Sequence, residues 1–162
     1  MINDISAAAT AEFISQMHAE CAALQAFIGL LETEQQALLT EQTEQIHALA
    51  DTKTQMLHQL TKLVNVRRNG MLMRGIKIEP GSMETWLQTH TAINLPAWHE
   101  IRQLATRAQH MNRTNGELIQ VKMRLNQQTL TMLHNATHIA NGLYGPDGQP
   151  SLPVSGRILK SV

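Results

Sequence analysis

Apolar residues along most of this chain recur at alternating intervals of three and four residues. The pattern covers three stretches, at about residues 4–38, 43–68 and 96–141. This spacing places the apolar side chains on one side of an α-helix, which then buries that side against other helices. We therefore expect an all-α protein: an elongated antiparallel helical bundle of three long helices.

The middle of the chain, residues 70–97, lacks this pattern. Glycines and a proline interrupt it, and the stretch "SMETWLQTH" predicts a short helix capped by Ser82. Upstream, "VNVRRNG" predicts that the second long helix ends just before Gly70. The connection between the second and third long helices should therefore contain one short helix.

The third long helix carries polar residues on its apolar seam. Asn115, Lys122 and Thr129 take positions that the spacing reserves for apolar side chains. A polar residue in such a seam costs stability but fixes how the helices pair. Further apolar residues beside the seam indicate that this helix buries more than a narrow stripe. These residues are Ile119, Val121, Leu130 and Leu133.

The end of the chain differs in composition from the helices. Residues 142–162 hold four of the nine Gly, three of the five Pro and the only Tyr, Tyr144. "GPDG" is a turn sequence, and the apolar residues after it are too few to form a core. We expect a helical bundle domain over residues 1–141 and a flexible C-terminal tail over residues 142–162. A partner that covers the tail's apolar residues would offset the cost of ordering it.

Charge is balanced over the whole chain, with 13 basic and 13 acidic residues, but it is unevenly distributed. Residues 1–60 hold eight acids and one base, whereas residues 61–162 hold twelve bases and five acids. Two halves that pack together through opposite charges explain this distribution best. A nucleic-acid-binding face is the alternative, but the bases are spread out and no aromatic residues interleave with them. We expect no nucleic-acid partner.

Three further features indicate where in the cell the protein is expected to be. Cys21 is the only cysteine, so no internal disulfide can form. No apolar run approaches the ~18 residues that a membrane span needs. The N-terminal residues lack the basic start and apolar core of a signal peptide. We therefore expect a cytoplasmic protein without membrane insertion.

Candidate chemistry in the sequence is sparse. His134 and His138 lie one helical turn apart, a spacing that can bind a metal, but no third ligand is evident. Two solvated histidines are the better interpretation, and Cys21 on the apolar stripe is better interpreted as a buried hydrophobic residue. The sequence contains no phosphate-binding loop and no nucleophile motif. We expect no metal, no cofactor and no enzymatic activity.

The nine methionines allow two interpretations. Flexible thioether side chains fill ordinary cores, and they also line adaptable binding surfaces. In and near the irregular middle, Met71, Met73 and Met83 lie close in sequence to Trp86 and Trp98. Core filling is favoured for any single methionine, whereas the group beside the tryptophans favours a partner groove.

Three features together resemble one known family. The junction after the first helix has two leucines, a short polar and acidic turn, an apolar helix start and a lysine. These are Leu38, Leu39, residues 40–44, residues 46–49 and Lys53. The last long helix has paired Asn before a Gly, at Asn112, Asn115 and Gly116, and Tyr144 with "GPDG" follows that helix. The combination resembles the FlgN family of flagellar export chaperones over nearly the whole chain, although residues 70–97 give no family signature.

The resemblance implies a cytoplasmic chaperone for flagellar type III protein export. Such a chaperone binds the C-terminal helices of hook–filament junction proteins, which are also called hook-associated proteins. It prevents their premature assembly and delivers them to the export gate. The alternative from the residues alone is a structural coiled-coil protein that self-associates through its heptads, and a homodimer stays open on either interpretation.

The resemblance also implies where the contacts lie. The client-binding surface of the family is in its C-terminal part, which corresponds here to about residues 125–162. The expected client contacts are the apolar residues of that segment. They are Leu125, Met132, Leu133, Ile139, Leu143, Leu152, Val154, Ile158 and Leu159. Tyr144 matches the family tyrosine that docks at the export gate, although local packing at the helix end is a nearly equal interpretation.

Overall fold

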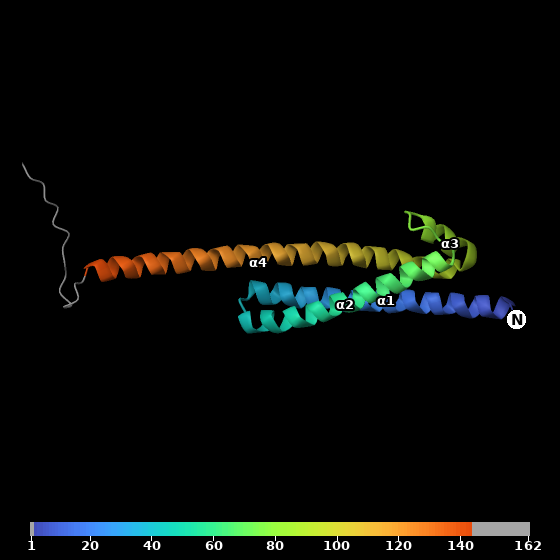
Figure 1. The fold of residues 1–162 in the computed structure, drawn as a ribbon, viewed down its shortest axis with the longest axis horizontal. Helices are drawn as coiled ribbons and strands as arrows, with labels where there is room; N and C mark the ends of the chain where they lie inside the picture. The colour runs from blue at the N-terminus through green and yellow to red at the C-terminus, as the bar shows by residue number, and fades with distance from the viewer. Residues whose placement is uncertain (1, 144–162) are drawn as a thin grey trace, which may run out of the picture. The chain divides into compact units, whose positions relative to one another are not determined.

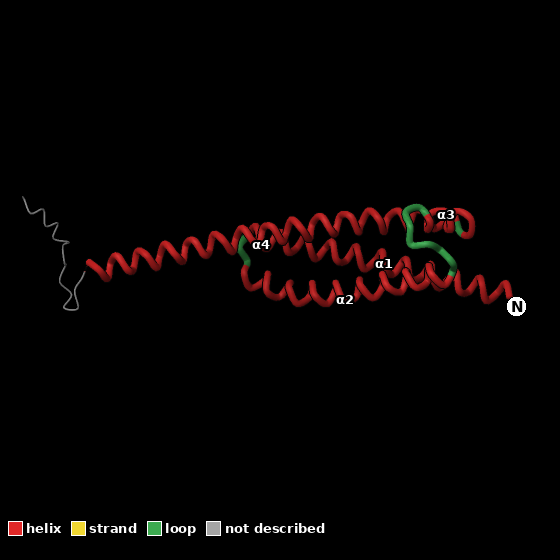
Figure 2. The backbone as a smooth tube through the Cα atoms, turned by 45° about the horizontal axis from the view of Figure 1, so that its top comes forward, coloured by secondary structure: helices red, strands yellow, loops and turns green. Residues whose placement is uncertain are grey.

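The fold consists of helices. The computed structural model describes residues 2–143, with side chains over residues 7–137. The elements are α1 (Ile2–Leu39), α2 (Thr43–Met73), α3 (Ser82–His90), the 3-10 helix η1 (Ala92–Asn94) and α4 (Leu95–Leu143) (Figure 1). Residues 2–143 contain no strand, as the colours of Figure 2 show, so the prediction of an all-α protein is confirmed.

The chain divides into two compact units. The first comprises residues 1–118, and the second comprises residues 119–162, of which 119–143 are described. α4 contributes to both units, because it runs through the boundary and ends at Leu143. The predicted division into a bundle domain and a tail after residue 141 stays a prediction.

α1 and α2 form an antiparallel hairpin in the first unit (Figures 1 and 2). A tight turn at residues 40–42 joins them, within the polar and acidic junction noted in the sequence. The N–H of Gln42 donates to the carbonyl of Ala37 at 3.0 Å, and Glu41 adopts a φ of 60°. The turn thus provides a donor for a carbonyl that the end of α1 leaves without a helical partner.

The apolar stripe of α1 supplies much of the core. Its predicted members Met17, Cys21, Ile28 and Leu31 are all buried, and the burial of Cys21 confirms its interpretation as a hydrophobic residue. Other elements complete the core with Leu60, Met71, Ile76, Met83, Leu87, Trp98, Ile101 and Ala108. Full burial of a large apolar side chain contributes about 1.5–3 kcal/mol. This core therefore supplies most of the free energy that holds the first unit together.

The first part of α4 packs along α1 in the parallel direction. Gln25 donates to Glu100 at 2.7 Å, and Arg107 donates to Glu32 at 2.6 Å. Residue numbers rise together along both helices, so the two helices run the same way. These contacts involve only the part of α4 before residue 119, and the arrangement of three long helices over their full lengths stays a prediction.

The predicted end of α2 at Gly70 is wrong. α2 continues to Met73, and Gly70 lies buried inside it. A Cβ atom on Gly70 would lie 2.7 Å from Cδ2 of Phe13 on α1. The absence of a side chain at Gly70 is therefore a requirement of close packing between α1 and α2, and not a sign of a helix terminus.

Gly75 ends α2 instead. It has a φ of 68°, in the left-handed region that favours glycine. The N–H of Ile76 donates to the carbonyl of Met71, and the N–H of Gly75 donates to that of Leu72, both at 3.0 Å. These two bonds form the Schellman arrangement. Ile76 and Met71 are both buried, which fits the apolar contact that usually accompanies this arrangement.

α3 covers the residues predicted for the short helix, but its start differs from the prediction. Ser82 is the first helical residue and not the cap, and the residue before it is Gly81 with a φ of 83°. The left-handed glycine turns the chain into α3 without a side-chain cap. Pro96 lies in the first turn of α4, where its missing N–H costs no helical bond.

Candidate functional site

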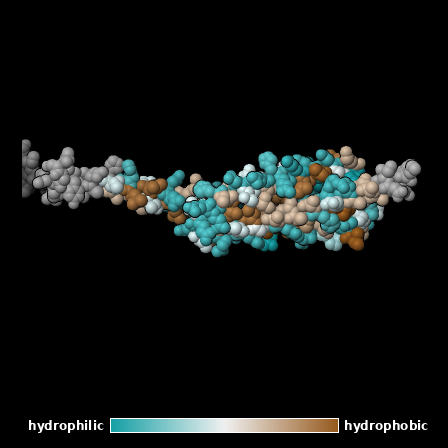
Figure 3. Space-filling view, turned by 90° about the horizontal axis from the view of Figure 1, so that it is seen from below, coloured by the Kyte–Doolittle hydropathy of each residue, from teal (hydrophilic) through white to brown (hydrophobic). Residues whose placement is uncertain are grey.

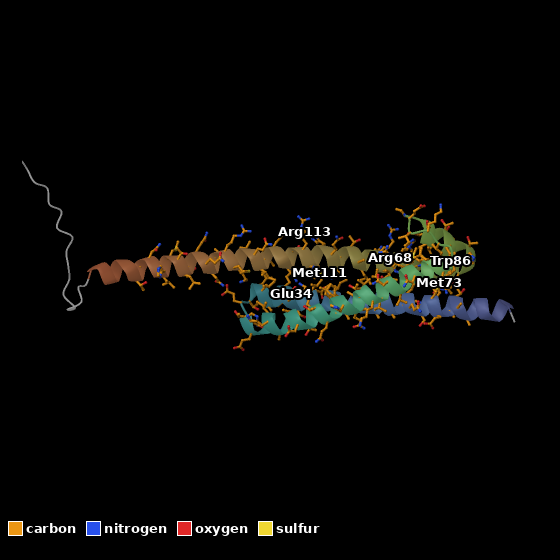
Figure 4. All side chains as sticks on the ribbon, viewed as in Figure 1. Glu34, Arg68, Met73, Trp86, Met111 and Arg113 are labelled. Carbon is orange, nitrogen blue, oxygen red and sulfur yellow. The ribbon has the colours of Figure 1, made fainter. Side chains whose placement is uncertain are left out.

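A buried carboxylate joins the three long helices in the first unit. Glu34 on α1 is 3 % exposed, and its two oxygens accept from Nζ of Lys53 on α2 at 3.0 and 2.7 Å (Figure 4). Asn115 on α4 donates from Nδ2 to Glu34 at 2.8 Å and to the carbonyl of Leu31 at 2.9 Å. These partners offset the cost of removing the carboxylate from water, which would otherwise be several kcal/mol.

Two members of this cluster belong to the stretches that carry the family resemblance. Lys53 closes the junction after the first helix, and Asn115 belongs to the Asn and Gly pattern of the last. Asn115 is 0 % exposed, which confirms its predicted place in the seam. The sequence prediction missed Glu34, although a signal exists. Glu34 follows Leu31 by three residues and precedes Leu38 by four, so it fits the buried spacing.

A second buried ion pair joins α1 to α2. Glu20 is 2 % exposed and accepts from Nε and Nη2 of Arg67 at 2.6 and 3.2 Å. The guanidinium carbon lies 5.1 Å from the ring centre of Trp98 on α4, which is a cation–π distance. This pair and the pair of Glu32 with Arg107 each join an acid of the first sixty residues to a later base. Both pairs agree with the predicted packing of two oppositely charged halves.

Two of the methionines near the tryptophans lie in the core, beside a pocket that they line together with Trp98. Met71 and Met83 are 4 % and 2 % exposed, and both belong with Trp98 to the core. Met73 differs from them, because it lies at the end of α2 and is 87 % exposed (Figure 4). The core-filling interpretation is therefore confirmed for Met71 and Met83.

Glu84 ties α3 to α4, and its pKa is shifted. Arg102 on α4 donates to the Glu84 carboxylate at 2.5 Å. Burial by itself would raise the pKa of Glu84, but the backbone N–H of Glu84, the indole of Trp98 and the Arg102 guanidinium outweigh burial and lower the pKa. The environment thus favours the charged carboxylate, which fixes α3 against the start of α4.

The exposure of α4 changes between the two units. In the first unit the seam residues Ile101 and Ala108 are 2 % and 5 % exposed. In the second unit Leu125 and Met132 continue the same seam, yet they are 55 % and 71 % exposed. The spacing typical of a buried helix therefore continues into a part of α4 that lies exposed.

Large apolar side chains gather on this exposed part of α4. Those exposed by half or more are Val121, Met123, Leu125, Leu130, Met132 and Leu133, which we call the apolar face of α4. Figure 3 shows apolar atoms, in brown, at the surface of this part of the helix. Large apolar side chains that gather at an exposed surface usually mark an interaction site. The apolar face is therefore the candidate functional site.

The structure places only some of the predicted client contacts. Leu125, Met132 and Leu133 lie on the apolar face. Ile139 and Leu143 belong to α4, but their side chains lie outside the described ones. The other predicted positions, which lie outside the described residues altogether, are Tyr144, Leu152, Val154, Ile158 and Leu159. The roles assigned to all of these residues stay predictions.

Three members of the apolar face are not among the predicted client contacts. The sequence places Val121 and Leu130 beside the seam, where it predicts burial, yet they are 50 % and 66 % exposed. Met123 is 57 % exposed and lies four residues after Ile119, also beside the seam. Apolar residues on both sides of a seam are the signal that could have identified them.

The apolar face is suited to binding another helix. An amphipathic helix can lay its apolar side against such a surface, with anchor residues at helical spacing. Among the side chains of residues 7–137, no three His, Cys, Asp or Glu come together as metal ligands do. Across the described helices, no stretch combines the length and the apolar character that a membrane span requires.

Comparison with known proteins gives one result. The family model described as FlgN protein matches residues 1–151, which include all the described helices. Searches of curated proteins and of solved structures found no match. FlgN proteins are chaperones of flagellar type III export and are not known as enzymes. The chain therefore belongs to the FlgN family of flagellar export chaperones.

Proposed function

We propose that this protein binds the C-terminal helices of hook–filament junction proteins in the cytoplasm. It prevents their premature assembly and delivers them to the type III export gate. The apolar face of α4 is the observation that carries the proposal, because its six large side chains are exposed by half or more. The position of this face in the C-terminal part of the chain agrees with the client-binding surface of the family.

Burial of the apolar face would drive client binding. Full burial of a large apolar side chain contributes about 1.5–3 kcal/mol. For a side chain that is exposed by half or more, much of this free energy is released only when a partner covers it. Leu125, Met132 and Leu133 are 55, 71 and 59 % exposed. A client helix that assembles through its own apolar side would turn that side to the chaperone, and it could not assemble while bound.

Delivery requires a docking residue that the client leaves accessible. Tyr144 directly follows α4, so it is close in sequence to the apolar face without belonging to it. The proposal assigns docking at the export gate to Tyr144, on the strength of the family resemblance. Release would follow from competition at the export apparatus, without a nucleotide.

Self-association through α4 is the alternative function. The seam that continues, exposed, at Leu125 and Met132 favours it, because such a seam also pairs identical helices. Light scattering distinguishes the two functions. A chaperone forms a mixed complex when a junction protein is added, whereas a self-associating coiled coil keeps the mass that it has alone.

The proposal is tested by making the apolar face polar. The variant carries Leu125→Ser, Met132→Ser and Leu133→Ser, and its affinity for a purified junction protein is measured by calorimetry. Loss of three apolar anchors should weaken binding about 100-fold or more. Since these side chains are exposed, the melting temperature should change little.

A matched control makes equally exposed apolar residues of the first unit polar. Leu72→Ser and Ile93→Ser replace side chains that are 59 % and 87 % exposed. This control should keep the affinity of the parent protein within about threefold. Equal losses in the two variants, or no loss in either, would contradict the proposed role of the apolar face.

A further inference from the structure

A pocket of about 300 Å³ lies within the first unit. It is lined by residues of α2, of the connection at residues 74–81, of α3 and of the start of α4. Figure 2 shows this connection, in green, as the loop that leads from α2 into α3. Pockets that hold small molecules measure about 300–1,000 Å³, so this one is at the lower limit and suits a single large side chain. Residues 70–97, which give no family signature, supply most of its wall.

Apolar groups form one part of the wall. Met71 lines the pocket from α2, Met83 from α3 and the ring system of Trp98 from α4. Thioether sulfur makes favourable contacts with aromatic rings. Ile78 lines the pocket from the connection and is 49 % exposed, so the apolar wall continues to the surface of the molecule. The pocket is therefore suited to an aromatic side chain that enters from outside.

One polar atom of the wall has no normal hydrogen bond. Nε1 of Trp98 is buried, and no acceptor in the described part of the chain lies at hydrogen-bond length and angle from it. The Glu84 carboxylate, which lines the same pocket, is close enough to the indole for its pKa to be lowered. Two polar groups without a direct bond of normal geometry are often bridged by a third group. A hydroxyl can bridge these two, because it accepts from the N–H and donates to the carboxylate.

The charges around the pocket favour an occupant without charge. Arg102 is paired with Glu84 at 2.5 Å, and Arg67 is paired with Glu20 at 2.6 Å. A charged occupant would compete with these ion pairs and would lose its own hydration. A free amino acid carries two charges on its main chain. A residue within a polypeptide carries neither of them, so the side chain of a protein fits better than a free amino acid.

We propose that this pocket binds a tyrosine side chain of a partner protein. The ring packs against Met71 and Met83, beside the guanidinium of Arg102, a group that stacks on aromatic faces. The hydroxyl accepts from Nε1 of Trp98 and donates to Glu84. Phenylalanine fills the same space but leaves the indole N–H without an acceptor, so the pocket distinguishes the two side chains. This site belongs to the first unit and not to the apolar face of α4, and the inference goes beyond the proposed function.

The test uses the full-length chain, isotope-labelled at the methionine methyl groups and the tryptophan indoles. The probe is N-acetyl-tyrosinamide, which carries the side chain without charged ends, and the titration is followed by NMR. The signals of Trp98 Nε1–H and of the Met71 and Met83 methyl groups should shift and saturate. The Kd should be in the millimolar range, as expected for so small a ligand. N-acetyl-phenylalaninamide should bind at least about 5-fold more weakly, because it lacks the hydroxyl.

Two variants and a matched control locate the site. Trp98→Phe removes the indole N–H and keeps an aromatic ring, so the preference for the tyrosine probe should fall to within about twofold, as measured at the Met83 methyl group. Ile78→Ser, at the exposed edge of the wall, should raise the Kd of the tyrosine probe about 3-fold to 10-fold. Leu72→Ser is the control, because Leu72 is 59 % exposed and does not line this pocket. It should leave the Kd within about twofold of the parent value.

Four outcomes would overturn the inference. The first is the absence of any shift at Trp98, Met71 and Met83. The second is an equal Kd for the tyrosine and phenylalanine probes, which would mean that the hydroxyl is not recognised. The third is tighter binding of free tyrosine than of N-acetyl-tyrosinamide, which would indicate an amino-acid site. The fourth is a set of shifts confined to Met123 and Met132, which would place the probe on the apolar face. None of these outcomes affects the proposed function, which is tested with a junction protein and variants of the apolar face.

Discussion

At the scale of single residues, the first unit depends on charges placed where the helices meet. Glu20 and Glu34 on α1 are nearly inaccessible to water, and each binds one base of α2. A buried pair of this kind adds little to stability compared with an apolar pair of the same volume, but loss of one member is costly. The two buried acids and their bases therefore specify which faces of the helices pair. Replacing one member of either ion pair lowers the stability of the protein.

Replacement of Lys53 should test this cost. Lys53→Met leaves the Glu34 carboxylate buried without its ammonium partner, and we expect the free energy of unfolding to fall by about 3 kcal/mol. Urea denaturation at pH 7 measures the change. Removal of the charge at both positions, with Glu34→Gln added to Lys53→Met, should recover part of the loss.

The control for Lys53 is an ion pair at the surface. Arg113 and Glu117 on α4 have side chains 80 % and 61 % exposed, and Arg113 points away from the bundle (Figure 4). Arg113→Ala should change the free energy of unfolding by less than about 0.5 kcal/mol. Similar changes for Lys53→Met and Arg113→Ala would show that the burial of Glu34 does not matter.

Two glycines within helices should respond oppositely to the same substitution. Gly70→Ala places a Cβ atom 2.7 Å from Phe13, which is itself 1 % exposed and cannot easily move. We expect it to destabilise the protein by about 1–3 kcal/mol, in spite of the better helix propensity of Ala. Gly29→Ala on α1 meets nothing within 4 Å and should stabilise by about 0.5–1 kcal/mol. Thermal melts that shift in the same direction for both would refute the close approach at Gly70.

At the scale of the elements, one carboxylate of α3 binds α4. Glu84 has a lowered pKa, so the folded state holds its proton less tightly than the unfolded state. Its contribution to stability is therefore fully present above the unfolded pKa and is lost as the pH falls through the folded pKa. The Arg102 side chain that it binds is 60 % exposed, so solvent screens part of this contribution.

A pH series should reveal the contribution of Glu84. Between pH 7 and about pH 3, the parent protein should lose more stability than Glu84→Gln does, because the variant has no proton to take up at this position. Urea denaturation at each pH measures the difference. The effect should be confined to acid pH; parallel curves for the two proteins would mean that Glu84 has the same pKa when folded and unfolded.

The elements also show which parts of the fold the sequence predicts. Helical spacing predicts α1, α2 and α4, because a repeat along the chain is a local property, and the stretch "SMETWLQTH" predicts α3. The end of α2 was assigned to Gly70 and lies near Gly75, because a neighbour on α1 decides the role of Gly70. Tertiary contacts of this kind leave no mark in the local sequence.

The burial of charged residues, like the ends of the helices, can be predicted from the sequence only in part. The uneven distribution of acids and bases predicts that oppositely charged parts pack together, and Glu20 with Arg67 agrees with this. The pattern does not say which acids are buried, because their partners come from other helices. Glu34 occupies a spacing that would have identified it, and Asn115 was found by that same spacing.

At the scale of the whole molecule, the sequence predicts the helical class and the family, while the structure shows where apolar side chains stay exposed. Leu125, Met132 and Leu133 were expected to contact a client and lie on the apolar face. Val121 and Leu130 were expected to be buried, and their exposure adds both to that face. Periodicity cannot distinguish a seam covered within the chain from one that awaits a partner, because both have the same spacing.

The central claim is that the exposed part of α4 is the surface that a client covers. Hydrogen–deuterium exchange of the full-length chain, with and without a purified junction protein, tests it most directly. Amides of residues 119–143 should exchange several-fold more slowly in the complex, while those of residues 13–31 keep their rates, because the core of the first unit is already formed. Slower exchange confined to residues 1–118, with no change in residues 119–143, would contradict the claim.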